Sequence, residues 1–132
     1  MRGPYYSNGP IHPGGFLVAT RDTNNDGKAD IIKRFGPDAS RQNGGGTGLG
    51  FYKGALYAEE GDTIMKRIVR YAISTDSMTP TSATADIIVN GLPANGDHPM
   101  HPFAIDPSGD MFMAVGSPGN PSQTQTRTPN AP

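Results

Sequence analysis

The apolar positions of this chain fall in short runs rich in β-branched and aromatic residues, and Gly, Pro, Asn or Asp separates the runs. The runs follow one another too closely for helices, and the pattern is typical of strands joined by turns. In residues 67–73 apolar and polar positions alternate, which indicates a strand with at least one apolar face. We therefore predict an all-β protein. Its expected strands lie near residues 15–21, 30–35, 48–52, 55–60, 65–73, 86–90, 103–106 and 111–116.

A weak internal repeat groups these strands. Residues 51–58 and 105–114 each read as strand, tight turn and strand, at a distance of about 55 residues, which suits one four-stranded propeller blade and a long loop. A β-sandwich hairpin is the alternative. We predict about two blades of a β-propeller: a first partial blade near 1–43, a second blade near 44–97 and the start of another near 98–132. Two blades cannot close a ring, so we expect a longer parent chain, or open sheet edges that promote association.

Composition narrows the class of protein. The chain has 132 residues with 18 Gly, 13 Pro and no Cys, which favours turns and excludes disulfides and thiolate metal sites. The net charge is -1 and basic residues form no extended surface, so we expect no nucleic-acid partner. No apolar run approaches the roughly 18 residues of a membrane helix, so we expect no membrane span. The first residues lack the apolar segment of a signal peptide, so we expect any leader peptide to lie outside this chain.

One polar loop matches the ligand spacing of a calcium site. Asp22, Asn24, Asp26 and Asp30 place oxygen side chains at positions 1, 3, 5 and 9, and Gly27 supplies the sharp turn at position 6. The glutamate that an EF-hand carries at position 12 is absent. The loop resembles the calcium loops of β-propellers and dockerins, and a metal-free Asn-Asp-Gly hairpin is the alternative. Its role would be structural in both cases.

The glycine-rich run at 44–48 suggests a phosphate-binding loop at first sight. It lacks the Lys-Ser/Thr ending, and a strand follows it, so no helix N-terminus would face a phosphate. A close approach of two backbones, or an irregular loop between blades, explains the glycines better.

Residues 96–117 carry the sharpest functional signal. Asp97 and His98 stand on a loop bounded by prolines, directly before a predicted strand, and proline stiffens such a loop. A histidine titrates near neutral pH and can accept a proton, while a carboxylate beside it can orient the ring. The alternative is a loop histidine that caps a hairpin or bonds a carbonyl, and for His101 we favour this alternative. A zinc site shared by both histidines would need further ligands.

The same residues resemble the Asp-His loop and the following hairpin of soluble quinoprotein glucose and sorbosone dehydrogenases. The glycine run and the Leu-Tyr pair at 56–57 look like the sorbosone branch of this family, and the resemblance covers residues 44–120. It implies a six-bladed propeller parent and a periplasmic or secreted enzyme. The implied cofactors are pyrroloquinoline quinone (PQQ) and Ca²⁺, and the implied substrate is an aldose or sorbosone.

Carried over residue by residue, the resemblance makes His98 the general base, which removes the proton of the sugar C1 hydroxyl while hydride passes to the quinone. Asp97 matches the residue before that base. Ser117 departs from the family pattern, in which Asp is common, and the residues that clamp the cofactor cannot be placed on this chain. We therefore expect the isolated chain to be inactive.

Two further functions compete with this one. The chain could be a propeller module without catalytic activity, in which Asp97 and His98 form only a turn. It could also be a calcium-stabilised carbohydrate-binding β domain with Tyr5, Tyr6 and Tyr52 as stacking surfaces.

Overall fold

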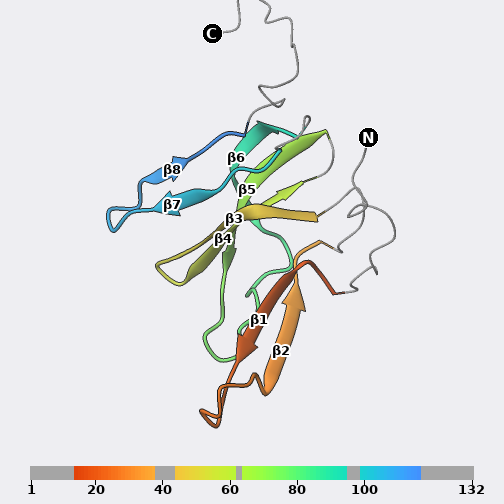
Figure 1. Ribbon diagram of the computed structural model, residues 1–132, viewed down its shortest axis with the longest axis vertical. Helices are drawn as coiled ribbons and strands as arrows, with labels where there is room; N and C mark the ends of the chain where they lie inside the picture. The colour runs from red at the N-terminus through yellow and green to blue at the C-terminus, as the bar shows by residue number, and fades with distance from the viewer. Residues whose placement is uncertain (1–13, 38–43, 62–63, 95–98, 117–132) are drawn as a thin grey trace, which may run out of the picture.

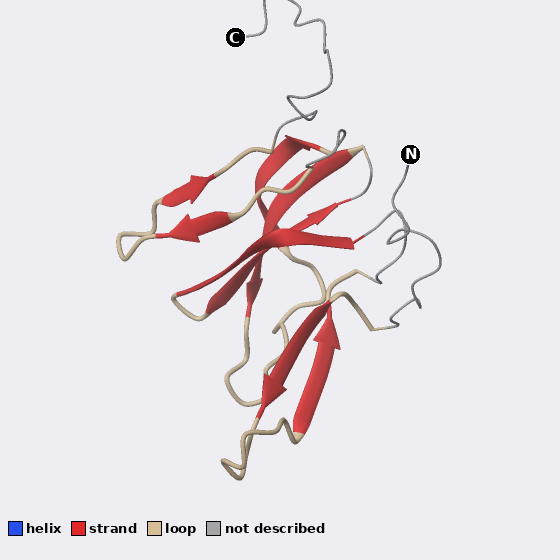
Figure 2. Ribbon diagram, viewed as in Figure 1, coloured by secondary structure: helices blue, strands red, loops and turns tan. Residues whose placement is uncertain are grey.

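The computed structural model describes residues 14–37, 44–61, 64–94 and 99–116, which form strands and loops without a helix (Figures 1 and 2). The all-β prediction is confirmed. Within these residues no helix is long and apolar enough to cross a membrane. The strands are β1 (Leu17–Arg21), β2 (Ile31–Phe35), β3 (Gly44–Tyr52), β4 (Ala55–Gly61), β5 (Met65–Ala72), β6 (Asp86–Pro93), β7 (Phe103–Ile105) and β8 (Met111–Met113).

Each predicted strand is present, and the main difference lies in the glycine run. β3 begins at Gly44, four residues earlier than expected, because the glycine backbone pairs with β4. The alternative of an irregular loop at 44–48 is therefore wrong. Glycine weakens a strand through its backbone freedom, so the sequence pattern hid a strand that its neighbour stabilises.

The strands form three antiparallel sheets in chain order: β1-β2, then β3-β4-β5-β6, then β7-β8. Within each sheet, strands that follow one another in the chain are neighbours. Lys53 and Gly54 join β3 to β4 with φ values of 44° and 76°, which suits a two-residue hairpin turn of type I′. The Asp106 carboxylate caps the β7–β8 turn by accepting bonds from the Gly109 and Asp110 amides at 2.8 and 2.9 Å.

One face of the central sheet packs against the β1–β2 hairpin. Leu17 of β1 forms a buried cluster with Ala58, Val69 and Tyr71 of the sheet. The Phe35 ring meets the edge of Tyr71, with ring centroids 5.6 Å apart. Burial of these side chains is the main force that holds the hairpin on β4 and β5.

The opposite face of the central sheet packs against β7. Here Gly48 and Gly50 of β3 face Phe103, and a Cβ at Gly48 would lie 2.6 Å from the Phe103 ring. No side chain fits in that space. A Cβ at Gly48 would also lie 2.7 Å from the His101 carbonyl oxygen, so the close approach of two backbones predicted from the glycine run is confirmed. The two hairpins lie on opposite faces of the central sheet.

Candidate functional site

The candidate catalytic pair lies in the connection between β6 and β7. Asp97 and His98 are outside the described residues, but the chain on both sides of them is described. Ala94 is buried where β6 ends, and His101 is fully buried just before β7.

Glu59 of β4 holds His101. The His101 ring meets the Glu59 carboxylate with Nδ1 2.9 Å from Oε1, and the His101 backbone N–H donates to Oε2 at 3.0 Å. Both side chains are essentially inaccessible to solvent. The pair thus ties the β6–β7 connection to the middle of the central sheet, three residues after His98.

A bulge in β3 supplies the other donors to this carboxylate. The β3–β4 register shifts between Gly45 and Leu49, so three β3 residues stand opposite Glu59 alone. The amides of Thr47 and Gly48 donate to Glu59 Oε2 at 3.1 and 3.4 Å. The carboxylate lies where a side chain at Gly46 would stand, so glycine is required there.

The chemistry of this pair is that of a charge-assisted clamp. A buried carboxylate is tolerated only when hydrogen bonds and a partner replace its water, and Glu59 has four donors. When Glu59 is ionised, Nδ1 carries the hydrogen of the bond. His101 Nε2 is buried and has no hydrogen-bond partner among the described residues. The prediction that His101 caps a hairpin or bonds a carbonyl is wrong, since its partner is a carboxylate.

Sequence analysis missed Glu59 altogether. The available signal was Glu59-Glu60 at the end of an otherwise apolar strand, where two adjacent charges must face opposite sides of the sheet. Glu60 on the other face accepts from Tyr71 Oη at 3.0 Å and pairs with Arg67 at 2.7 Å. Burial, together with the Glu60 charge, raises the pKa of the Tyr71 hydroxyl well above its usual range. This second cluster is structural, because every polar group in it is partnered.

The polar loop joins β1 to β2 as a hairpin whose carboxylates bind its own backbone. Asp22 accepts from the amides of Asn25 and Gly27 at 2.7 and 2.8 Å, which lowers its pKa, with the Gly27 bond as the largest cause. Asp30 accepts from the Thr23 hydroxyl at 2.6 Å and from the Thr23 amide, and these bonds lower its pKa as well.

The other two predicted ligands of this loop also bond within it. Asn24 Oδ1 accepts from the Asp26 amide at 2.9 Å, and Asp26 Oδ1 accepts from the Lys28 amide at 2.8 Å. In the described part of the chain no group of three or more His, Cys, Asp or Glu residues could hold a metal ion. Calcium at Asp22, Asn24, Asp26 and Asp30 stays a prediction.

Of the three candidate stacking tyrosines, Tyr5 and Tyr6 lie outside the described residues. Tyr52 has structural contacts. Its hydroxyl donates to the Pro107 carbonyl at 3.2 Å, and Lys53 Nζ lies 4.9 Å from its ring centroid. These contacts engage one face of the ring and the hydroxyl.

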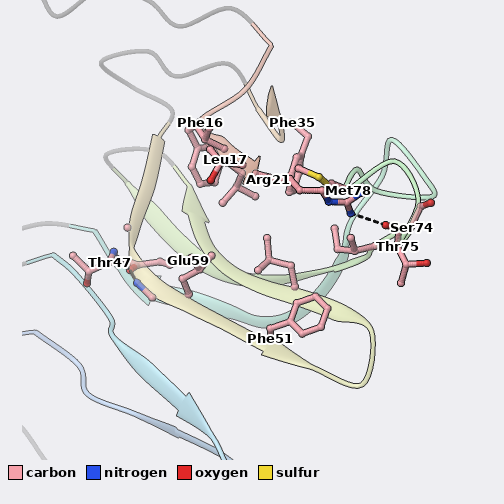
Figure 3. Close-up of a pocket in the computed structure, with 18 residues that line it drawn as sticks. Phe16, Leu17, Arg21, Phe35, Thr47, Phe51, Glu59, Ser74, Thr75 and Met78 are labelled. Atoms are coloured by element: carbon pink, nitrogen blue, oxygen red, sulfur yellow. Dashed lines mark hydrogen bonds between the residues drawn. The ribbon is translucent and has the colours of Figure 1, made fainter. Parts of the chain in front are cut away.

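A groove of about 800 Å³ opens between β1 and the edge of the central sheet (Figure 3). Phe16 and Leu17 line one wall and Phe51 lies on the wall opposite. Thr47 and Glu59 mark one end, while the Arg21 guanidinium closes the other by donating to the Thr75 carbonyl at 2.9 Å. Its lining is mostly apolar, and its two charged residues, Arg21 and Glu59, already have hydrogen-bond partners.

No family model, no curated protein and no solved structure matches this chain.

Proposed function

We propose that this chain is part of a quinoprotein sugar dehydrogenase of the glucose/sorbosone type, built as blades of a β-propeller, in which His98 is the general base. The substrate would be an aldose or sorbosone. The imidazole would accept the proton of the hydroxyl at the oxidised carbon, since a histidine near neutral pH has a free nitrogen for this task.

The observation that carries the proposal is the anchored position of His101, three residues after His98 in the sequence. Glu59 anchors the β6–β7 connection at His101 through two hydrogen bonds of 2.9 and 3.0 Å. A general base must be held within hydrogen-bonding reach of its proton, and a loop tied to a sheet core meets that need better than a free loop. The proline after His98 limits the backbone further.

The arrangement of the sheets supports the propeller part of the proposal. A four-stranded antiparallel sheet with neighbours in chain order is the form of a propeller blade, and hairpins on both of its faces are what adjacent blades would supply. The connection from the last strand of one blade to the first strand of the next would then carry Asp97 and His98. β3 and β7, which contact each other, would be the first strands of two successive blades.

The described residues do not form a cage for PQQ. This cofactor carries carboxylates, which call for cationic side chains. Arg67 and Arg70 of the central sheet are paired with Glu60 and Asp86 at 2.7 and 2.9 Å, and the described part of the chain holds no metal-binding cluster. We therefore assign only the proton acceptor to this chain and no step to the quinone.

The test uses the parent enzyme, loaded with PQQ and Ca²⁺ and assayed by dye reduction with glucose and with sorbosone. We expect His98→Gln to lower kcat at least a hundredfold, in the range of a lost general base, while quinone binding by absorbance is retained. The matched control is His12→Gln, because His12 also precedes a proline. Unchanged turnover in His98→Gln, or an equal loss in the control, would refute the assignment.

A further inference from the structure

The sheet of the first hairpin is open on the side of the groove. Among the described residues β1 pairs with β2 alone, and all of Leu17–Arg21 lines the groove, whereas β2 contributes only Phe35. The free edge of β1 therefore borders the groove. A strand edge with unpaired backbone groups is a template for another strand.

The floor of the groove is an uncovered part of an apolar face. The β1–β2 hairpin covers one face of the central sheet, but only over β4 and β5. Leu49 and Phe51 of β3 lie on this same face without that cover, and they are 58% and 65% exposed. Val18 of β1 also lines the groove and is 46% exposed. This surface continues the buried cluster around Leu17, so its missing cover should also be a piece of β-sheet.

The last hairpin has the complementary features. In β7–β8, Phe103 and Ile105 face the glycines of β3, and alternation puts Ala104 and Phe112 on the opposite side. Phe112 is 66% exposed. In the described residues β8 pairs with β7 alone, so this hairpin also has an open edge and an apolar outer face.

We propose that copies of this chain associate head to tail, with the β7–β8 hairpin of one copy filling the groove beside β1 of the next. Within one chain this hairpin already lies over β3 on one face of the central sheet. A second copy's hairpin over the other face of β3 would bring Phe112 against Leu49 and Phe51. Its β8 would lie along β1, and the strand order β7-β8-β1-β2 would complete a four-stranded sheet like β3–β6.

Charge at the end of the groove favours this orientation. The tip of the β7–β8 hairpin lies beside Tyr52, where β3 ends, and it carries the carboxylates of Asp106 and Asp110. We place the second copy's hairpin in the groove with its tip pointing along β3 as it does within one chain. The tip would then reach the end of the groove that Arg21 closes, which is the end away from Thr47 (Figure 3). A cation would therefore meet the acidic tip.

The contact is heterologous, since the hairpin and the groove are different surfaces of one chain. Such contacts generate a ring when the rotation between copies closes and a filament when it does not. The inference rests on sheet edges and apolar faces, not on the proposed chemistry of His98, so either proposal can fail without the other.

The test is the mass of the chain in solution, measured by sedimentation over a hundredfold range of concentration. We expect assemblies at multiples of 13.9 kDa. Phe112→Asp damages only the hairpin and Leu49→Asp damages only the groove, so each variant alone should be a monomer. An equimolar mixture should form a complex of two chains, because one intact hairpin and one intact groove remain.

The matched control is Ile87→Asp on β6, because Ile87 is 54% exposed and lies away from both surfaces. It should assemble like the unmodified chain. Circular dichroism shows whether each variant keeps its β-structure, and Phe112→Ser and Leu49→Ser replace any variant that does not. A monomer at every concentration would mean that another part of the chain, or a small molecule, covers the groove. That result, dissociation of the control, or a mixture that stays monomeric would overturn the proposal.

Discussion

Removal of the Glu59 carboxylate is expected to destabilise the protein more than removal of the His101 ring, although the two form one pair. His101→Leu deletes one charge-assisted hydrogen bond of 2.9 Å, and it also removes Nε2, which has no partner. Such a bond contributes about 1.5–3 kcal/mol to the free energy of unfolding, and we expect a loss in that range.

Glu59→Leu removes the same bond and also the acceptor of the Thr47, Gly48 and His101 amides. The Gly48 and His101 amides are buried, and each buried donor left without a partner costs about 1–3 kcal/mol, so the total loss should exceed about 3 kcal/mol. Glu59→Gln keeps an oxygen for the amides and should lose only about 1–2 kcal/mol, because the charge alone is gone.

The assay is urea unfolding followed by circular dichroism, with the free energy of unfolding extrapolated to water. The double variant Glu59→Leu, His101→Leu shows whether the loss comes from the bonds to the backbone amides or only from the pair with His101. An isolated buried ion pair can often be replaced by apolar side chains without loss, but here the three amides should keep the double variant nearly as unstable as Glu59→Leu alone. A double variant as stable as the unmodified protein, or a larger loss in His101→Leu than in Glu59→Leu, would refute the clamp.

Two further predictions concern the packing of β3 and the polar loop. Gly48→Ala should lower the free energy of unfolding by about 1–3 kcal/mol, and Gly50→Ala should lower it by less. The reason is that the added Cβ would lie 2.6 Å from the Phe103 ring at Gly48 but 3.1 Å from it at Gly50. Equal melting temperatures of the two variants would contradict this order. The lowered pKa values of Asp22 and Asp30 mean that their contribution to stability is present above about pH 4 and is lost as the pH falls through those values. The melting temperature should therefore fall as the pH is lowered below about 4, and Asp22→Asn should show a smaller fall than the unmodified chain.

Local patterns were sufficient to predict most of the fold. Alternation in β5 and the turn residues around Gly54 and Gly109 are properties of a few adjacent residues, so they predict strands and hairpins directly. The start of β3 was not predictable in this way. A strand that begins with three glycines is stabilised by β4 and by the Glu59 carboxylate, and neither contact is visible in the glycine run itself.

The candidate site was predictable only in part. The segment around His98 stands out by its residues, whereas Glu59 lies 42 positions before its partner His101. No spacing rule connects residues so far apart, because the contact depends on how β7 packs over the central sheet. The same holds for the groove, which exists only because β1 and β3 belong to different sheets.

The adjacent glutamates of β4 have a consequence for folding accuracy. Glu59 is bound by the bulge amides and His101 on one face, while Glu60 is bound by Arg67 and Tyr71 on the other. A slip of β4 by one residue would place one glutamate in the other's site, leave the second carboxylate without its donors and turn Ala58 away from the Leu17 cluster. Only one alignment of β4 therefore gives both carboxylates their donors, so the two faces of the strand together select its register.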